Sequence, residues 1–190
     1  IACLIFLCAA SVRLVIVAQP LPVQLDKALP DDAYYYFLTA QNIAAGNGPS
    51  VDGMNASNGW HPLWMLVNTA VFSGVQGDPD APVRVVLALG ALCDSLVAVC
   101  IFWGLRRLQS TSAAVIGGLA YAFNIMPILQ AVNGLETGLA ALMLALAWLA
   151  TLRLLRQQRQ RRPNRTAQRS MQRVATPATQ PVSPARPSSA

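Results

Sequence analysis

Four ionisable residues in this sequence could together move a proton or bind a cation. Asp31 and Asp32 open a segment rich in tyrosine, His61 is the only histidine among the 190 residues, and Glu136 lies much further along the chain. Carboxylates can take a proton from a hydroxyl nucleophile or hold a divalent cation. We therefore expect a catalytic site that contains Asp31, Asp32 and Glu136, with Asp31 and Asp32 as the ligands of any divalent cation, Mg²⁺ or Mn²⁺.

Purely structural roles are the alternative for each of these residues. An Asp pair can cap the helix that follows it and complement the helix dipole, and a lone histidine in a loop is commonly a polar surface residue. Asp94 differs because it lies inside an apolar segment, where an acidic residue is a functional candidate. Asp94 could equally form a hydrogen bond across helices, to Asn124 or to a backbone carbonyl.

The segment after the acidic pair has helical periodicity. We expect a helix from about residue 33 to residue 45, because Gly46-Asn47-Gly48-Pro49 is a strong stop signal. Phe37, Ala40 and Ala44 recur at a spacing of three or four residues, which places them on one helix face that could lie on a membrane surface. The acidic pair then stands at the start of a juxtamembrane helix.

A second short helix is expected over residues 62–75. Its 14 residues are too few to span a membrane comfortably, which favours a helix at the interface. Pro62 suits its first turn, and His61 precedes it at a position where helix termini favour anions. We expect the substrate-binding side chains among the polar and aromatic residues around these two helices: Tyr35, Asn58, His61 and Trp64.

The composition predicts an all-α, polytopic membrane protein. Apolar residues make up 54% of the chain and charged residues 12%, about half the charged fraction of soluble domains. The apolar residues gather in long blocks, which argues against a soluble enzyme, a disulfide-stapled domain or a disordered protein. We expect about four transmembrane spans, near residues 1–18, 83–105, 112–132 and 137–155, with juxtamembrane helices in the first exterior loop.

The charge distribution predicts the orientation of these spans. Nine of the 14 basic residues lie at or after Arg153, and all eight acidic residues lie between Asp26 and Glu136. The positive-inside rule therefore predicts an exterior loop over residues 19–82 and a cytoplasmic tail over residues 156–190. We expect this basic, Pro/Ser-rich tail to be disordered, to follow a membrane domain of residues 1–155, and to bind no nucleic acid.

Three segments together resemble a known family: DDAYYYFLTAQNIAAGNGPSVDG, NGWHPLW and the later NGLETGL. Over roughly residues 1–155 the chain resembles the C-type glycosyltransferase superfamily, polytopic membrane enzymes that use lipid-phosphate-linked sugars. The protein O-mannosyltransferases, the aminoarabinose transferase of lipid A and the arabinofuranosyltransferases belong to it. The resemblance implies that Asp31 is central to catalysis, that Asp32 is the second acid of the pair, that His61 lies near the lipid phosphate, and that Glu136 is a later exterior acid.

The resemblance implies transfer of a sugar from a polyprenyl-phosphate donor to a hydroxyl of a glycan, lipid or protein acceptor at the exterior face of a bilayer. We expect this bilayer to be a bacterial inner membrane. Members of the superfamily usually have many more spans, so we expect an N-terminal part of such an enzyme or a truncated gene product. The alternatives are a non-enzymatic membrane protein, such as a transporter fragment or lipid-binding scaffold, and an inactive remnant.

The predicted orientation can be tested by cysteine accessibility. In a variant without its native cysteines, we expect a cysteine at residue 70 or within residues 77–82 to react with a membrane-impermeant maleimide from outside the cell. Arg106→Cys should react only after the membrane is permeabilised, because the second span carries it to the opposite side. Labelling of position 106 from outside would contradict the four-span topology.

Overall fold

The described part of the chain is all-helical. A computed structural model describes the backbone of residues 1–175 and the side chains of residues 1–160. The chain divides into two compact units, Ile1–Ala150 and Thr151–Ala190, and the functional site described below lies in the first. The helices are α1 (Ala2–Val17), α2 (Leu21–Lys27), α3 (Asp31–Ala44), α4 (Pro62–Gly74), α5 (Ala81–Leu108), α6 (Thr111–Ala122), α7 (Ile125–Ala131) and α8 (Thr137–Ala175).

Two helices are long and apolar enough to cross a membrane: α5 and the Thr137–Gln160 part of α8. Two further candidates are bent helix pairs, α1 with α2 (bent by 101°) and α6 with α7 (bent by 55°), so up to four spans are possible. The prediction of an all-α chain is confirmed. The expected span over residues 112–132 is not one continuous helix, because Asn124 ends α6 and its side chain caps α7, accepting a hydrogen bond from the Met126 amide at 3.0 Å.

Two further expectations differ from the structure. The helix predicted over residues 33–45 begins at Asp31, and its Phe37 and Ala40 are buried in the protein core with Trp64 and Leu87 rather than laid against a membrane. The described backbone of α8 continues to Ala175, so residues 156–175 are helical where a disordered tail was expected. Arginine and glutamine, which dominate this stretch, have high helix propensity. Residues 176–190 lie outside the described residues.

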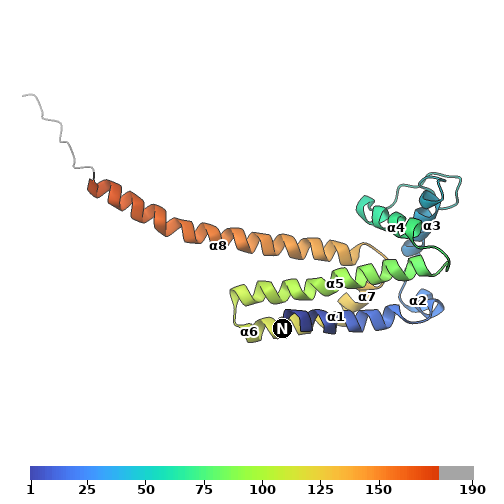
Figure 1. Ribbon diagram of the computed structural model, residues 1–190, viewed down its shortest axis with the longest axis horizontal. Helices are drawn as coiled ribbons and strands as arrows, with labels where there is room; N and C mark the ends of the chain where they lie inside the picture. Colours follow the sequence, from blue (N-terminus) through green and yellow to red (C-terminus); the bar gives the residue numbers. More distant parts are fainter. Residues whose placement is uncertain (176–190) are drawn as a thin grey trace, which may run out of the picture. The chain divides into compact units, whose positions relative to one another are not determined.

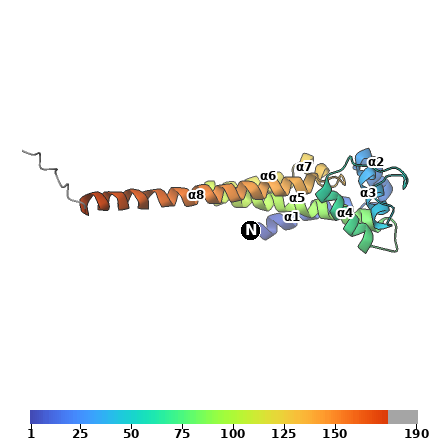
Figure 2. The same ribbon diagram turned by 90° about the horizontal axis from the view of Figure 1, so that it is seen from above.

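Helix α5 is the axis around which the first unit is arranged. Helices α1 and α6 pack along it, while α2, α3 and α4 gather at the end where α5 begins (Figures 1 and 2). The 28 residues of α5 span about 42 Å at 1.5 Å per residue. Arg106 and Arg107 therefore lie at the end of α5 far from the acidic residues of α3.

A buried ion pair joins α1, α5 and α6. Arg13 is 0% exposed and Asp94 3%, and the Nε atom of Arg13 donates to Oδ2 of Asp94 at 2.7 Å. Arg13 also donates to the carbonyl oxygens of Ala9 and Ala122, both at 3.0 Å. The hydroxyl of Tyr121 donates to the other Asp94 oxygen at 2.6 Å. Asp94 thus bonds across helices, but with Arg13 and Tyr121 rather than with Asn124.

The sharp bend between α1 and α2 is also held by side chains. A helix leaves its last carbonyl oxygens without partners in the helix. Here the Gln24 side-chain amide donates to the carbonyls of Val17 at 2.6 Å and Gln19 at 2.8 Å, and Arg84 of α5 donates to the Gln19 carbonyl at 3.1 Å. These bonds satisfy the end of α1 and place α2 beside the start of α5.

Removing one charge of the ion pair should lower the free energy of unfolding much more than removing both charges. Asp94→Asn leaves Arg13 buried without its counter-charge, so we expect the free energy of unfolding in detergent to fall by about 3–5 kcal/mol. The double variant Arg13→Met/Asp94→Leu should recover most of this loss, because it leaves no buried charge.

Asp26→Asn is the matched control, since the Asp26–Lys27 pair has side chains 69% and 75% exposed and should contribute less than about 1 kcal/mol. A stability of Asp94→Asn equal to that of Asp26→Asn would show that the buried pair does not hold the helices together.

Candidate functional site

A polar cavity of about 370 Å³ opens at the end of the helix bundle where α3 begins. Three parts of the chain that are distant in sequence line it: the first turns of α3, the loop before α4, and the turn between α7 and α8. The lining residues are Asp32, Tyr35, Tyr36, Ser57, Gly59, Trp60, His61, Leu135 and Glu136. Two carboxylates, the only histidine and two tyrosines thus share one cavity.

Tyr36 is the centre of the hydrogen-bond network in this cavity. Its hydroxyl donates to Oε2 of Glu136 at 3.0 Å and accepts from the His61 backbone N–H at 2.9 Å. The same hydroxyl lies 2.9 Å from Nδ1 of the His61 ring. That ring nitrogen also lies 3.1 Å from Oε1 of Glu136. Tyr36, His61 and Glu136 therefore form a closed triangle of polar contacts.

The turn that carries Glu136 is fixed by its neighbours. The indole N–H of Trp64 donates to the Gly134 carbonyl at 2.9 Å, and the Asn133 side chain accepts from the Leu135 amide at 3.0 Å. Gly134 has a φ of 80° and packs so closely on α3 that an added Cβ would lie 2.8 Å from the ring of Phe37. Only glycine suits this position, so Glu136 is brought onto α3 by a closely packed turn.

The loop between α3 and α4 is held in place over α3. The Asn42 side chain donates to the carbonyls of Ser50 at 3.0 Å and Val51 at 3.2 Å. Within the loop, hydrogen bonds from the backbone and side chain of Asn55, and then from the Met54 amide, lower the pKa of Asp52 to about 2. This turn is part of the loop that leads back to His61 at the start of α4.

The structure brings together some of the residues that the sequence singled out and not others. Asp32, Tyr35, His61 and Glu136 line the cavity, whereas Asp31, Asn58 and Trp64 are not among the lining residues. Trp64 is 2% exposed and supports the turn through its bond to Gly134. Asp31 and Asp32 occupy the first turn of α3 without a side-chain capping bond. They complement the helix dipole there but do not cap it.

The sequence pattern did not single out Tyr36, the centre of the hydrogen-bond network, and only Tyr35 was expected in the site. The available signal was its spacing, because Tyr36 follows Asp32 by four residues and i,i+4 side chains share a helix face. Tyr36 also falls on the buried face with Ala33 and Ala40. A run of three tyrosines does not itself reveal which one faces the acids.

No group of three or more His, Cys, Asp or Glu side chains in the described part of the chain is arranged to hold an ion. Asp31 and Asp32 are adjacent on α3, so their side chains diverge by about 100° around the helix axis. The Mg²⁺ or Mn²⁺ ion expected at this pair stays a prediction, and no chemical step is assigned to a metal.

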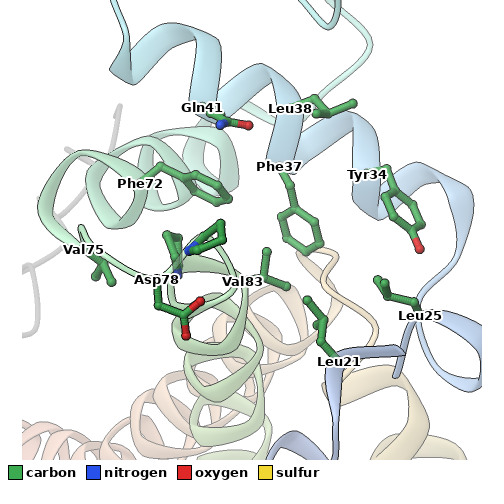
Figure 3. A pocket seen from close by; sticks show the side chains of 13 residues that line it. Leu21, Leu25, Tyr34, Phe37, Leu38, Gln41, Phe72, Val75, Asp78 and Val83 are labelled. Atoms are coloured by element: carbon green, nitrogen blue, oxygen red, sulfur yellow. The ribbon is translucent and has the colours of Figure 1, made fainter. Parts of the chain in front are cut away.

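A second cavity, of about 440 Å³, lies on another face of α3 and is mainly apolar (Figure 3). Helix α3 contributes a stripe at helical spacing, Tyr34, Phe37, Leu38 and Gln41. Helices α2 and α4, the loop between α4 and α5, and the start of α5 complete the lining. Phe37 and Phe72 stack across it with ring centroids 6.2 Å apart. Asp78 is the one charged residue in the lining. One helix thus separates a polar from an apolar cavity.

Comparisons of the chain with known protein families, with characterised proteins and with solved structures give no match. The functional argument therefore rests on the geometry of the two cavities and on the chemistry of the residues that line them.

The surroundings of Tyr36 raise the pKa of its hydroxyl. Burial is the largest cause that raises its pKa, from 10.0 to about 12, and the hydrogen bond to Glu136 and the charges of Glu136 and Asp32 add to the rise. The unfolded chain therefore ionises first, and the stability that Tyr36 contributes is fully present below pH 10.0 and is lost as the pH rises toward about 12.

We expect the tyrosinate absorbance of the folded chain, minus that of Tyr36→Phe, to show a midpoint near pH 12. Tyr35→Phe is the control, because Tyr35 is 57% exposed. A difference midpoint near 10.0, the ordinary tyrosine value, would mean that Tyr36 is not enclosed by Glu136 and His61.

Proposed function

We propose that the chain is a polytopic protein of a bacterial inner membrane and carries the sugar-transfer site of a membrane glycosyltransferase. The donor is a polyprenyl-phosphate-linked sugar, and the acceptor is a hydroxyl of a glycan, lipid or protein. Two apolar helices of sufficient length, with two bent pairs beside them, support the membrane location. The acids of α3 and the arginines at the far end of α5 support an exterior loop over residues 19–82.

The observation that carries the proposal is the position of α3 between two different cavities. A polyprenyl-phosphate sugar is amphipathic, so a site for it needs an apolar surface for the isoprenoid chain beside a polar site for the sugar. Helix α3 lines an apolar cavity of about 440 Å³ with one face and a polar cavity of about 370 Å³ with another. The 101° bend between α1 and α2 turns α2 across the end of the bundle, where a juxtamembrane helix would lie.

The polar cavity offers a carboxylate for the transfer reaction. In an inverting transfer, the acceptor oxygen attacks the anomeric carbon, the bond from that carbon to the phosphate oxygen breaks, and polyprenyl phosphate leaves with the bonding electrons. The acceptor proton must pass to a basic group. Asp32 is the carboxylate placed to take this proton or to stabilise the positive charge that develops at the anomeric carbon. The geometry favours Asp32 over Asp31 because only Asp32 lines the cavity.

The contacts of Asp94, inside the helix bundle, favour an enzyme over a transporter. Transporter sites usually lie near the middle of the membrane, at broken helices. Asp94 is the acid nearest that position, but Arg13 and Tyr121 occupy both of its carboxylate oxygens. The groups that remain available for chemistry gather at the end of the bundle, where a lipid-linked sugar would arrive.

Transfer assays with two Asp→Asn variants test the proposal. The chain in proteoliposomes is incubated with polyprenyl-phosphate-[14C]mannose or -[14C]arabinose, and loss of labelled donor is measured. We expect Asp32→Asn to lower turnover by about a hundredfold or more, the usual contribution of such a group. Asp31→Asn is the matched control and should retain most of the activity.

The reverse pattern, with Asp31→Asn inactive and Asp32→Asn active, would restore Asp31 to the role that the resemblance implies. A wild-type chain that neither consumes these donors nor binds undecaprenyl phosphate, measured by quenching of Trp60 in the polar cavity, would contradict the proposed function.

A further inference from the structure

We propose that His61 and Glu136 form a proton-transfer dyad in which Glu136 and Tyr36 hold the imidazole proton on Nδ1 and leave Nε2 as the proton-accepting atom of the polar cavity. The catalytic role of the dyad rests on the proposed function, whereas the tautomer does not. The dyad takes the acceptor proton and leaves Asp32 to stabilise charge at the anomeric carbon.

The partners of the Tyr36 hydroxyl determine where its hydrogen and the nearby hydrogens lie. A phenol has one proton to donate and can accept two hydrogen bonds. The Glu136 carboxylate can only accept, so the Tyr36 proton points to Oε2 at 3.0 Å. The His61 backbone N–H can only donate, and it occupies one acceptor position at 2.9 Å. The contact of 2.9 Å between the Tyr36 hydroxyl and Nδ1 is then favourable only if Nδ1 carries a proton.

A second contact leads to the same tautomer independently. Nδ1 of His61 lies 3.1 Å from Oε1 of Glu136, and a carboxylate oxygen facing an unprotonated ring nitrogen would bring two lone pairs together. A proton on Nδ1 removes the conflict and is shared between Glu136 and Tyr36. The hydrogen bond made by one ring nitrogen sets the state of the other, so the neutral imidazole presents its lone pair at Nε2.

Nε2 is free to meet a substrate. Among the described residues it forms no hydrogen bond, and the His61 side chain is 70% exposed, while that of Glu136 is 25% exposed. The anchored side of the ring therefore faces the protein and the free side is open. An acceptor hydroxyl in the cavity can place its proton on Nε2 while its oxygen attacks the anomeric carbon.

The charged side chains that line the cavity with the ring are carboxylates. When Nε2 takes the acceptor proton, His61 becomes an imidazolium ion beside the Glu136 carboxylate, with Asp32 lining the same cavity. No lysine or arginine is among the residues that line this cavity, so no positive charge opposes the step. Glu136 is thus a positioning residue that orients the imidazole, while His61 is the catalytic residue.

Nitrogen NMR of the histidine ring tests the tautomer directly. Because His61 is the only histidine, the chain labelled with [15N]histidine in detergent gives one pair of ring signals. We expect the neutral ring to show a protonated Nδ1 and an unprotonated Nε2. In Tyr36→Phe/Glu136→Ala both Nδ1 contacts are lost, because neither new side chain has an acceptor, so the proton should shift toward Nε2. Asp31→Asn is the control that should leave the spectrum unchanged.

A wild-type ring with its proton on Nε2, or a double variant with the wild-type spectrum, would overturn the dyad. This measurement needs no donor, so it decides the tautomer even if the proposed sugar transfer proves wrong.

Substitutions of His61 test the role of Nε2. The amide nitrogen of His61→Asn can replace Nδ1–H as the donor to Glu136, but no atom replaces Nε2. We expect this variant to keep its unfolding midpoint in detergent and to lose about a hundredfold or more in donor turnover. Glu136→Gln should lose less activity. Turnover by His61→Asn at the wild-type rate would exclude Nε2 as the proton acceptor.

Discussion

The buried pair between Arg13 and Asp94 is the constraint on which the first unit of the fold depends. Moving two charges out of water costs several kcal/mol per ion, and only close geometry with further hydrogen bonds offsets that cost. Arg13 meets this demand with Asp94 and two carbonyl oxygens, and Asp94 with Arg13 and Tyr121. A slip of α1 along α5 would leave both charges unpaired, so the pair sets the register of these helices. If the bundle lies in a bilayer, lipid offers neither charge an alternative partner.

The site depends on that register through backbone contacts at the other end of α5. An added Cβ at Gly90 would lie 2.8 Å from the Ala131 carbonyl oxygen, and one at Gly138 would lie 2.6 Å from the Gly90 carbonyl oxygen. Small residues let α7 and the start of α8 approach α5 this closely. This close approach places the short turn between α7 and α8 beside α3, where the indole N–H of Trp64 donates to the carbonyl of Gly134. The ion pair fixes α5, and the backbone contacts of α5 with α7 and α8 then position Glu136 beside His61.

Much of the fold could be predicted from residue patterns, and the failures have a common cause. The short α4 was predicted almost to the residue, because Pro62 and the apolar run that follows are local signals. The all-α class followed from the apolar blocks. The sequence did not reveal the partner of Asp94, which of Asp31 and Asp32 lines the cavity, or the contacts of Tyr36, because each depends on which faces of two helices meet. Local patterns specify a helix, but the rotation of that helix against its neighbours is decided by tertiary packing.

The two acidic clusters of the protein differ in a way that bears on function. Asp94 is buried and has each carboxylate oxygen bonded to Arg13 or Tyr121, so it stabilises the helix packing. The Tyr36, His61 and Glu136 triangle is equally well connected on its inner side, yet it leaves Nε2 of an exposed imidazole without a bond among the described residues. The open nitrogen belongs to a cavity that Asp32 also lines, which is the arrangement that the proposed proton transfer would use.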